Sequence, residues 1–177
     1  NVFHNWSKNY ISQQQTGAVR EGLAVYQTSQ RDARFYGFEA QAILPLWQAD
    51  NQQLSMTLFS DYVRGEYVGG GNVPRIPPLR YGFQLDYAGY DGVSADLRLS
   101  RAENQAYAGE YATKTSGYLL LDAKVAYKMR VWDNYKLLAF IKAKNLLNET
   151  IRNASSFLKD VAPEQGRSAE IGLRLTF

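Results

Sequence analysis

The sequence predicts an all-β protein, an antiparallel up-and-down segment of a transmembrane β-barrel with about eight strands. Apolar and polar residues alternate with a period of two over most of the chain, and no stretch shows convincing helical periodicity. Aromatic residues make up 14% of the chain and include 13 tyrosines, although the mean hydropathy of -0.40 is that of a soluble protein. Membrane β-barrels combine these features because only every second strand residue faces lipid.

The expected strands follow one another along the whole chain. The alternation is clearest in 117–131, where Asp122 and Lys124 stand between Leu121, Ala123 and Val125. Most segments approach the roughly 9–11 residues that cross a bilayer at a tilt. The pattern predicts strands at residues 1–11, 34–44, 54–62, 79–87, 92–101, 117–131, 135–148 and 168–177.

Short and long connections alternate between these strands. The turn-like connections are 45–53, 90–92 and 132–135, with Asp-Asn or Asp-Gly pairs that favour turns. The longer connections are 12–33, 69–78, 102–115 and 149–167. In an up-and-down barrel this order places tight turns on one rim and long loops on the other, as in outer-membrane barrels. The last strand then ends with Phe177 in the aromatic girdle at the rim of the short turns.

One face of the expected sheet carries charges of both signs. We expect Leu97, Leu121, Ile141 and Leu173 to face outward and the charged residues to line the interior. Mixed signs are expected there because burying an unpaired charge is costly. A soluble barrel with its apolar residues inside is an alternative interpretation of the same alternation. The expected interior residues are Arg80, Asp86, Asp96, Arg98, Asp122, Lys124, Lys142, Lys144, Glu170 and Arg174.

Composition argues against several functions. The chain has no cysteine, so it forms neither disulfides nor a thiolate metal site. The net charge is +3 with both signs interspersed, which argues against a nucleic-acid partner. His4 is the single histidine, and it lies in an expected strand rather than in a catalytic or zinc-binding constellation. We therefore expect no enzyme, no cofactor and no metal site in these residues.

Several stretches resemble the TonB-dependent outer-membrane receptors. "ARFYGFEAQ" (33–41) is similar to the penetrating-strand motif of this family, and "VPRIPPLRYGFQLDY" (73–87) to its Pro-Arg-x-Pro strand start. "IKAKNLLNET" (141–150) with "GRSAEIGLRLTF" (166–177) resembles its closing pair of strands. "NASSFLKDVAPEQGRS" (153–168) is similar to the last extracellular loop of the ZnuD-like zinc-uptake subfamily.

The resemblance implies a function in the bacterial outer membrane. Receptors of this family have a plugged barrel of about 22 strands, of which residues 1–177 would be the C-terminal part, without the plug, the earlier strands or the TonB box. The implied activity is import of a scarce metal or metal complex, with zinc favoured over haem or a siderophore. The implied partners are the remaining barrel and plug, TonB through the absent N-terminal part, and outer-membrane lipid. The interior charges would contact the plug, and Phe177 resembles a C-terminal assembly signal.

A complete small barrel is the alternative, because about eight strands also suit a membrane anchor or adhesin. Closing such a barrel would crowd Lys124, Lys142, Lys144 and Arg174 into a narrow lumen. We therefore expect an open curved sheet in which the edge strands, 1–11 and 168–177, do not pair with each other.

Overall fold

The computed structural model describes residues 1–132 and 135–177 as one sheet of eight strands. A turn of 3-10 helix, η1 (Tyr90–Gly92), is the one helical element in this part of the chain. None of its helices has the length and apolar character needed to cross a membrane. The strands are β1 (Val2–Arg20), β2 (Leu23–Ala49), β3 (Gln52–Tyr67), β4 (Arg80–Ala88), β5 (Val93–Ala102), β6 (Tyr118–Trp132), β7 (Tyr135–Lys144) and β8 (Ser168–Thr176).

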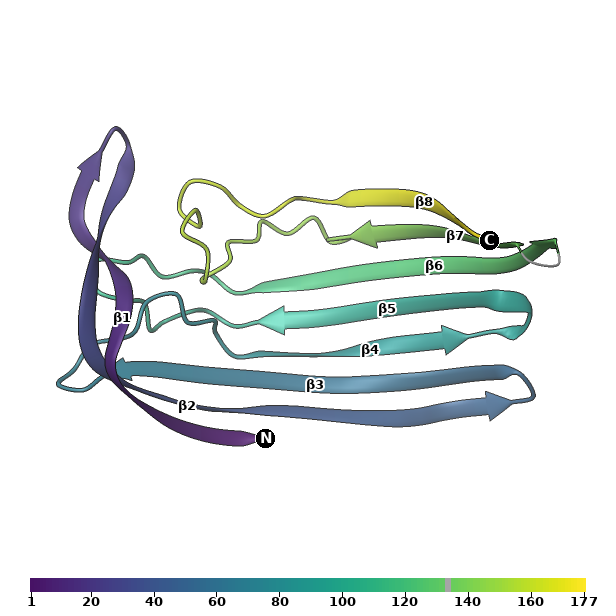
Figure 1. The fold of residues 1–177 in the computed structure, drawn as a ribbon, viewed down its shortest axis with the longest axis horizontal. Helices are drawn as coiled ribbons and strands as arrows, with labels where there is room; N and C mark the ends of the chain where they lie inside the picture. Colours follow the sequence, from purple (N-terminus) through teal and green to yellow (C-terminus); the bar gives the residue numbers. More distant parts are fainter. Residues whose placement is uncertain (133–134) are drawn as a thin grey trace.

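The sheet is an antiparallel meander in which each strand pairs with its neighbours in sequence (Figure 1). The order runs from β1 to β8, and over the described residues these two edge strands form no ladder with each other. The predicted fold class, the eight strands and the open edges are therefore confirmed. The expected turn at 132–135 falls partly on residues 133–134, which lie outside the described part of the chain.

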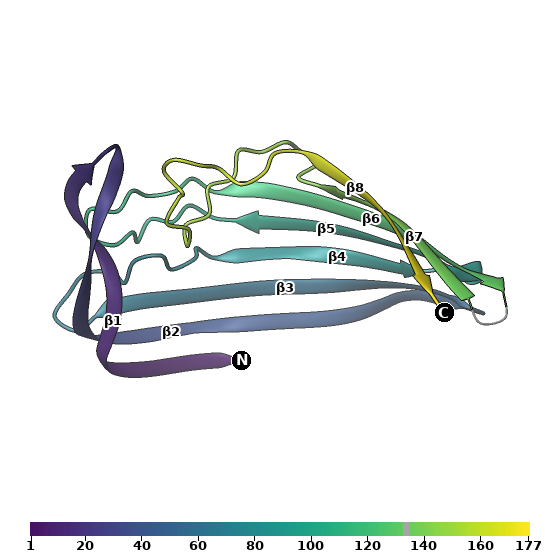
Figure 2. The ribbon, with the colours of Figure 1, turned by 45° about the horizontal axis from the view of Figure 1, so that its top comes forward.

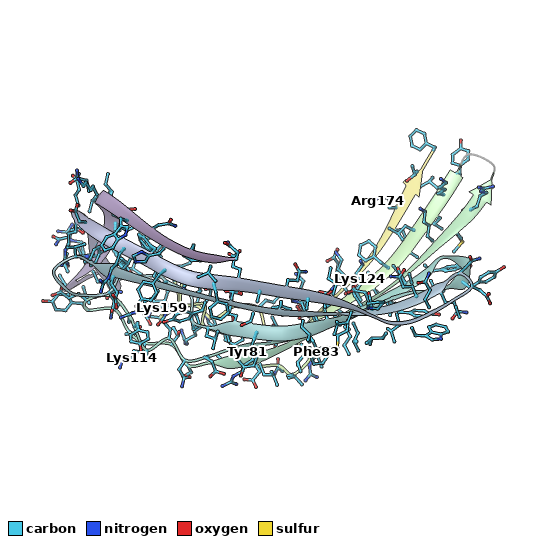
Figure 3. The ribbon with its side chains drawn as sticks, turned by 90° about the horizontal axis from the view of Figure 1, so that it is seen from below. Tyr81, Phe83, Lys114, Lys124, Lys159 and Arg174 are labelled. Atoms are coloured by element: carbon cyan, nitrogen blue, oxygen red, sulfur yellow. The ribbon has the colours of Figure 1, made fainter. Side chains whose placement is uncertain are left out.

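The sheet is a single curved layer rather than a packed sandwich (Figure 2). Seen from below, Lys124 and Arg174 lie toward its hollow side, and Tyr81 and Phe83 lie on the opposite, convex side (Figure 3). Successive side chains of a strand point to opposite faces, so the period of two in the sequence becomes one charged face and one apolar face.

The expected long connection at 12–33 is wrong, because these residues extend β1 and β2 into one long hairpin. Ladder pairs continue from Tyr10 opposite Arg31 to Arg20 opposite Leu23. Glu21 and Gly22 form the turn with positive φ values of 51° and 80°. The alternation of apolar and polar residues does not reveal this hairpin, since glutamine, serine and threonine occupy both of its faces.

Most other boundaries differ only slightly from the expected ones. The turn expected at 45–53 is shorter in the structure. Only residues 50 and 51 separate β2 from β3, and Asp50 has a positive φ of 48°. At the other rim, β7 ends at Lys144 instead of continuing to residue 148. Asn145 adopts a positive φ of 51° directly after it, which ends the extended conformation.

The small apolar core lies at the rim of the long connections rather than along the sheet. Ala33, Tyr67 and Val73 are almost fully buried, and Phe35 and Ile76 pack against them. A single layer has no second layer to cover its faces, so large apolar side chains such as Leu173 and Ile171 stay exposed on β8. The hydrogen-bonded sheet and the apolar residues packed at the rim of the long connections therefore position the candidate site, and no central core does so in the described residues.

Candidate functional site

The ten residues predicted for the interior occupy one face of the sheet, which we call the charged face. Cross-strand partners in an antiparallel sheet share a face, and the pairs Asp96–Lys124, Lys124–Lys142 and Lys142–Glu170 form one continuous row across β5 to β8. The charged face comprises Arg80, Asp86, Asp96, Arg98, Asp122, Lys124, Lys142, Lys144, Glu170 and Arg174.

Several of these charges form ion pairs between neighbouring strands. Lys124 Nζ lies 3.6 Å from Asp96 Oδ1, and Lys142 Nζ lies 3.5 Å from Glu170 Oε2. Their side chains keep between 35% and 59% of their surface exposed, so each such pair contributes only about 0–1 kcal/mol. The ion pairs thus place opposite charges on neighbouring strands but add little to the stability of the sheet.

Other charges of the same face are held by neutral groups. Arg98 donates from Nη1 to Gln84 Oε1 at 3.1 Å, and its guanidinium lies over the Phe59 ring at 3.9 Å. Asp122 accepts a hydrogen bond from the backbone N–H of Asn145 at 2.9 Å. Lys144 and Arg174 form no ion pair within residues 1–132 and 135–177.

Sequence reasoning left further charged residues of this face out of the predicted set, among them Glu39 and Asp61, which lie opposite each other. Asp61 accepts two hydrogen bonds from Arg80, from Nε at 3.0 Å and from Nη2 at 2.9 Å. The period of two did place Asp61 on the face of Phe59, but an aromatic residue among polar ones obscured the assignment. The cation–π contact of Arg98 explains why Phe59 belongs there.

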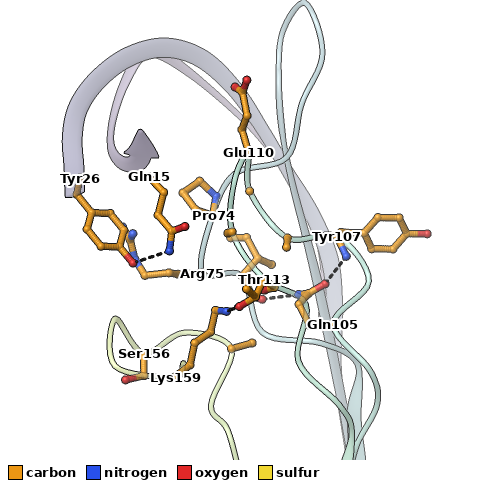
Figure 4. Close-up of a pocket in the computed structure, with 15 residues that line it drawn as sticks. Gln15, Tyr26, Pro74, Arg75, Gln105, Tyr107, Glu110, Thr113, Ser156 and Lys159 are labelled. Atoms are coloured by element: carbon orange, nitrogen blue, oxygen red, sulfur yellow. Dashed lines mark hydrogen bonds between the residues drawn. The ribbon is translucent and has the colours of Figure 1, made fainter. Parts of the chain in front are cut away.

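The long connections meet at the end of the sheet opposite the short turns, where the β1–β2 hairpin also lies (Figure 1). Their contact region, the long-connection cluster, encloses a cavity of about 20 Å³, which suits about one water molecule (Figure 4). It is a packed junction rather than a chamber for substrate. Residues that line it include Gln15, Tyr26, Pro74, Arg75, Gln105, Thr113 and Lys159.

Lys159 joins two of these connections. Its ammonium group donates to the Thr113 carbonyl oxygen at 2.8 Å, to the Thr113 hydroxyl, and to both carboxylate oxygens of Asp160 at 3.0 and 3.2 Å. Only 8% of the Lys159 side chain is exposed. Burial by itself raises the pKa of Asp160, but the hydrogen bonds from Thr113 and Lys159 outweigh it, and the pKa lies below its usual value.

Two buried amide side chains fix the ends of the same connections. Asn145 bonds the backbone of Glu149 in both directions at 2.9 Å and donates to the Gln165 carbonyl oxygen at 3.3 Å. Gln105 donates to the Ile76 carbonyl oxygen and accepts from the Tyr107 N–H at 2.8 Å. No periodic signal marks these residues, so sequence reasoning did not find them.

His4 lies among aromatic rings on the apolar face of β1. Its ring meets Trp6 edge to face at 4.9 Å and lies 6.1 Å from the Tyr36 ring. No group of three or more metal-ligating side chains occurs in the described part of the chain. At the other rim Phe177 is 90% exposed, and its ring lies 6.4 Å from Tyr135.

Comparison with known proteins agrees with this geometry. The family model "TonB dependent receptor-like, beta-barrel" matches residues 1–146. The solved structure "Copper transporter OprC" is similar with a TM-score of 0.76 and 21% sequence identity, over 98% of this chain and 28% of that one. This chain thus spans less than a third of the length of that transporter. A match to a receptor family confirms the expectation that the chain is not an enzyme, and the chain belongs to the TonB-dependent receptor-like β-barrel family.

Proposed function

We propose that this chain forms part of the wall of a receptor in the bacterial outer membrane that imports a metal or a metal complex. The observation that carries the proposal is the two-sided single sheet in a chain of a receptor-barrel family. No second layer of secondary structure packs on either face of the described sheet. In a membrane barrel both faces of such a sheet are used, because one faces lipid and the other faces an aqueous or plugged interior.

In this proposal the apolar face meets lipid. Leu97, Ile141 and Leu173 are 37%, 55% and 73% exposed, which would leave an unusually large apolar surface in water. The charged face then lines the lumen, and the direction of curvature supports this, since Lys124 and Arg174 lie toward the hollow side (Figure 3). There the charged face would contact a plug domain.

The edges of the sheet support a larger barrel. Among the described residues, β1 pairs with β2 alone and β8 with β7 alone. Unpaired backbone groups at a lipid-exposed edge each cost several kcal/mol. We therefore propose that further strands of the receptor pair with both edges, and that TonB acts on parts outside residues 1–177. The open sheet is not the closed eight-stranded barrel that an anchor or adhesin would need.

Two likenesses bear on the metal of the imported substrate. Residues 153–168 favour zinc through their likeness to a zinc-uptake loop, whereas the similar solved structure is named a copper transporter. Likeness at 21% identity supports the fold alone, so zinc stays the favoured metal of the proposal.

Metal uptake by intact cells tests the function. The full-length receptor would be deleted, and uptake of radioactive zinc and copper measured at limiting metal concentration, with and without active TonB. We expect uptake of one metal to fall on deletion, to return with the full-length gene, and to require TonB. Equal uptake of both metals in all these strains would reject the proposal.

A further inference from the structure

A second pocket, of about 130 Å³, lies where the charged face meets the long connections, and we call it the arginine pocket. Arg80 and Tyr118 lie in one cross-strand row, each opposite Ala102 of β5. Residues 152–155 of the β7–β8 connection line the pocket together with Thr115 and Ser116 of the β5–β6 connection. The pocket is therefore built from the sheet and two separate connections.

Two guanidinium groups retain donors at this pocket. Arg80 uses Nε and Nη2 on Asp61, so its Nη1 has no hydrogen bond to any described residue. Arg152 donates Nη1 to the Lys159 carbonyl oxygen and makes no ion pair in the described part of the chain. The Nε and Nη2 atoms of Arg152 keep the geometry that binds a carboxylate in bidentate fashion.

The remaining polar lining consists largely of hydroxyl groups. The hydroxyls of Thr115, Ser116, Tyr118 and Ser155 have no hydrogen-bond partner among residues 1–132 and 135–177, and each can donate to an anionic oxygen. With the two arginines, they give the pocket more donors than its own acceptors can satisfy. A site of this composition favours an anionic ligand over a bare metal cation.

The one carboxylate residue of the lining points elsewhere. Glu103 Oε1 accepts hydrogen bonds from the Tyr81 hydroxyl at 2.9 Å and from Arg101 Nε at 3.4 Å. Tyr81 lies on the convex face of the sheet, opposite the face of Arg80 (Figure 3). The side chain of Glu103 is thus held on the other face. Asp61 pairs with Arg80, and Arg152 lies near Asp160, so the pocket itself holds the arginine donors that these carboxylates leave free.

We propose that the arginine pocket binds the carboxylate group of a small molecule. The inference rests on the proposed function, because it names the ligand class of the same barrel: the metal enters as a complex with a carboxylate-bearing molecule. A volume of about 130 Å³ exceeds the roughly 10–15 Å³ that one water requires, so a carboxylate and a short carbon stem fit.

Calorimetric titration of the purified full-length receptor tests the site. The probe is malonate, a small dicarboxylate, and malonamide serves as its uncharged analogue. We expect malonate to bind and malonamide not to bind. Arg152→Gln should weaken malonate binding at least about tenfold, the loss of about 1.4 kcal/mol.

Matched variants separate binding from folding. Tyr118→Phe removes one hydroxyl and keeps the ring, and it should weaken malonate binding about threefold. Arg167→Gln changes an arginine of the same connection whose one hydrogen bond is made by its backbone N–H, and it should leave binding unchanged. Because Arg152 also holds the Lys159 carbonyl, Tyr118→Phe keeps the test valid if Arg152→Gln disturbs the connection.

Three outcomes would overturn the inference: no malonate binding, equal binding of malonamide, or equal loss in the Arg167→Gln variant. Failure of the proposed function would look different. In that case malonate binds and depends on Arg152, but uptake of zinc and copper by cells does not depend on the receptor.

Discussion

The charged face and the long-connection cluster both consist of charged and polar side chains, yet they differ in what holds them. On the charged face, Lys142 and Glu170 meet at 3.5 Å while 37% and 59% of their side chains stay exposed. In the cluster, Lys159 is 8% exposed and makes four hydrogen bonds to Thr113 and Asp160. The difference teaches that burial and the number of partners decide the strength of a polar contact.

The largest expected effect follows from removing the buried cation. Lys159→Ala leaves the Thr113 carbonyl and the Asp160 carboxylate without their partner, and it should cost about 2–3 kcal/mol in local stability. Hydrogen exchange of the full-length receptor measures this as lost protection of the amides in 103–117 and 145–167.

Lys114 provides the control, because it is an exposed lysine of the β5–β6 connection and directly follows Thr113, the partner of Lys159 (Figure 3). Lys114→Ala should change amide protection by less than about 0.5 kcal/mol. If both alanine variants lose amide protection equally, the buried contacts of Lys159 do not stabilise the cluster more than an exposed side chain does.

Asn145 should show the next largest effect. Asn145→Ala removes the side-chain hydrogen bonds to Glu149 and Gln165 and replaces asparagine by alanine, which tolerates a φ of 51° less well, at a cost of about 2 kcal/mol. Asn145→Gly loses the same bonds but adopts this φ without strain, so it should lose less protection. A larger loss in the glycine variant would contradict the assigned backbone conformation.

The cluster should also weaken in acid. The pKa of Asp160 is lowered in the folded state, so its contribution to stability is present above its ordinary pKa of about 4 and is lost as the pH falls through the folded value. A spin label on Leu158→Cys, at an exposed position, should become more mobile below about pH 4. Adding Asp160→Asn should make that mobility independent of pH, and an unchanged pH dependence in this double variant would refute the assignment.

The smallest effect is expected on the charged face. Lys142→Gln breaks the ion pair with Glu170, and the free energy of unfolding from lipid should change by less than about 1 kcal/mol. Glu170→Gln should behave alike. A loss as large as that of Lys159→Ala would show that the charged face is buried in the assembled protein, as close contact with a plug would produce.

The same contrast explains how far the sequence could predict the structure. Strands such as β5 and β6 were predictable because Leu97 and Leu121 alternate with Arg98 and Asp122, so one period encodes both conformation and face. The β1–β2 hairpin was not, since its polar residues occupy both faces and its pairing is set by the backbone ladder.

The long-connection cluster could not be predicted for a different reason. Lys159 and Thr113 are 46 positions apart, and no local pattern brings them together. The arginine pocket likewise depends on residues from separate connections. Asp61 could have been predicted from the sequence, because the alternation places it on the same face as Ser55 and Thr57. The aromatic Phe59 on that face hid the pattern.

A cysteine scan along β6 of the full-length receptor in lipid vesicles tests the central claim most directly, namely that the apolar face meets lipid and the charged face lines the interior. Residues 1–177 contain no cysteine, so each introduced cysteine is the one labelled site of this segment. With a fluorophore attached, positions 121, 123 and 125 should be quenched by a lipid-soluble quencher, and positions 122, 124 and 126 should not. Uniform quenching along the strand, or the opposite alternation, would contradict the claim.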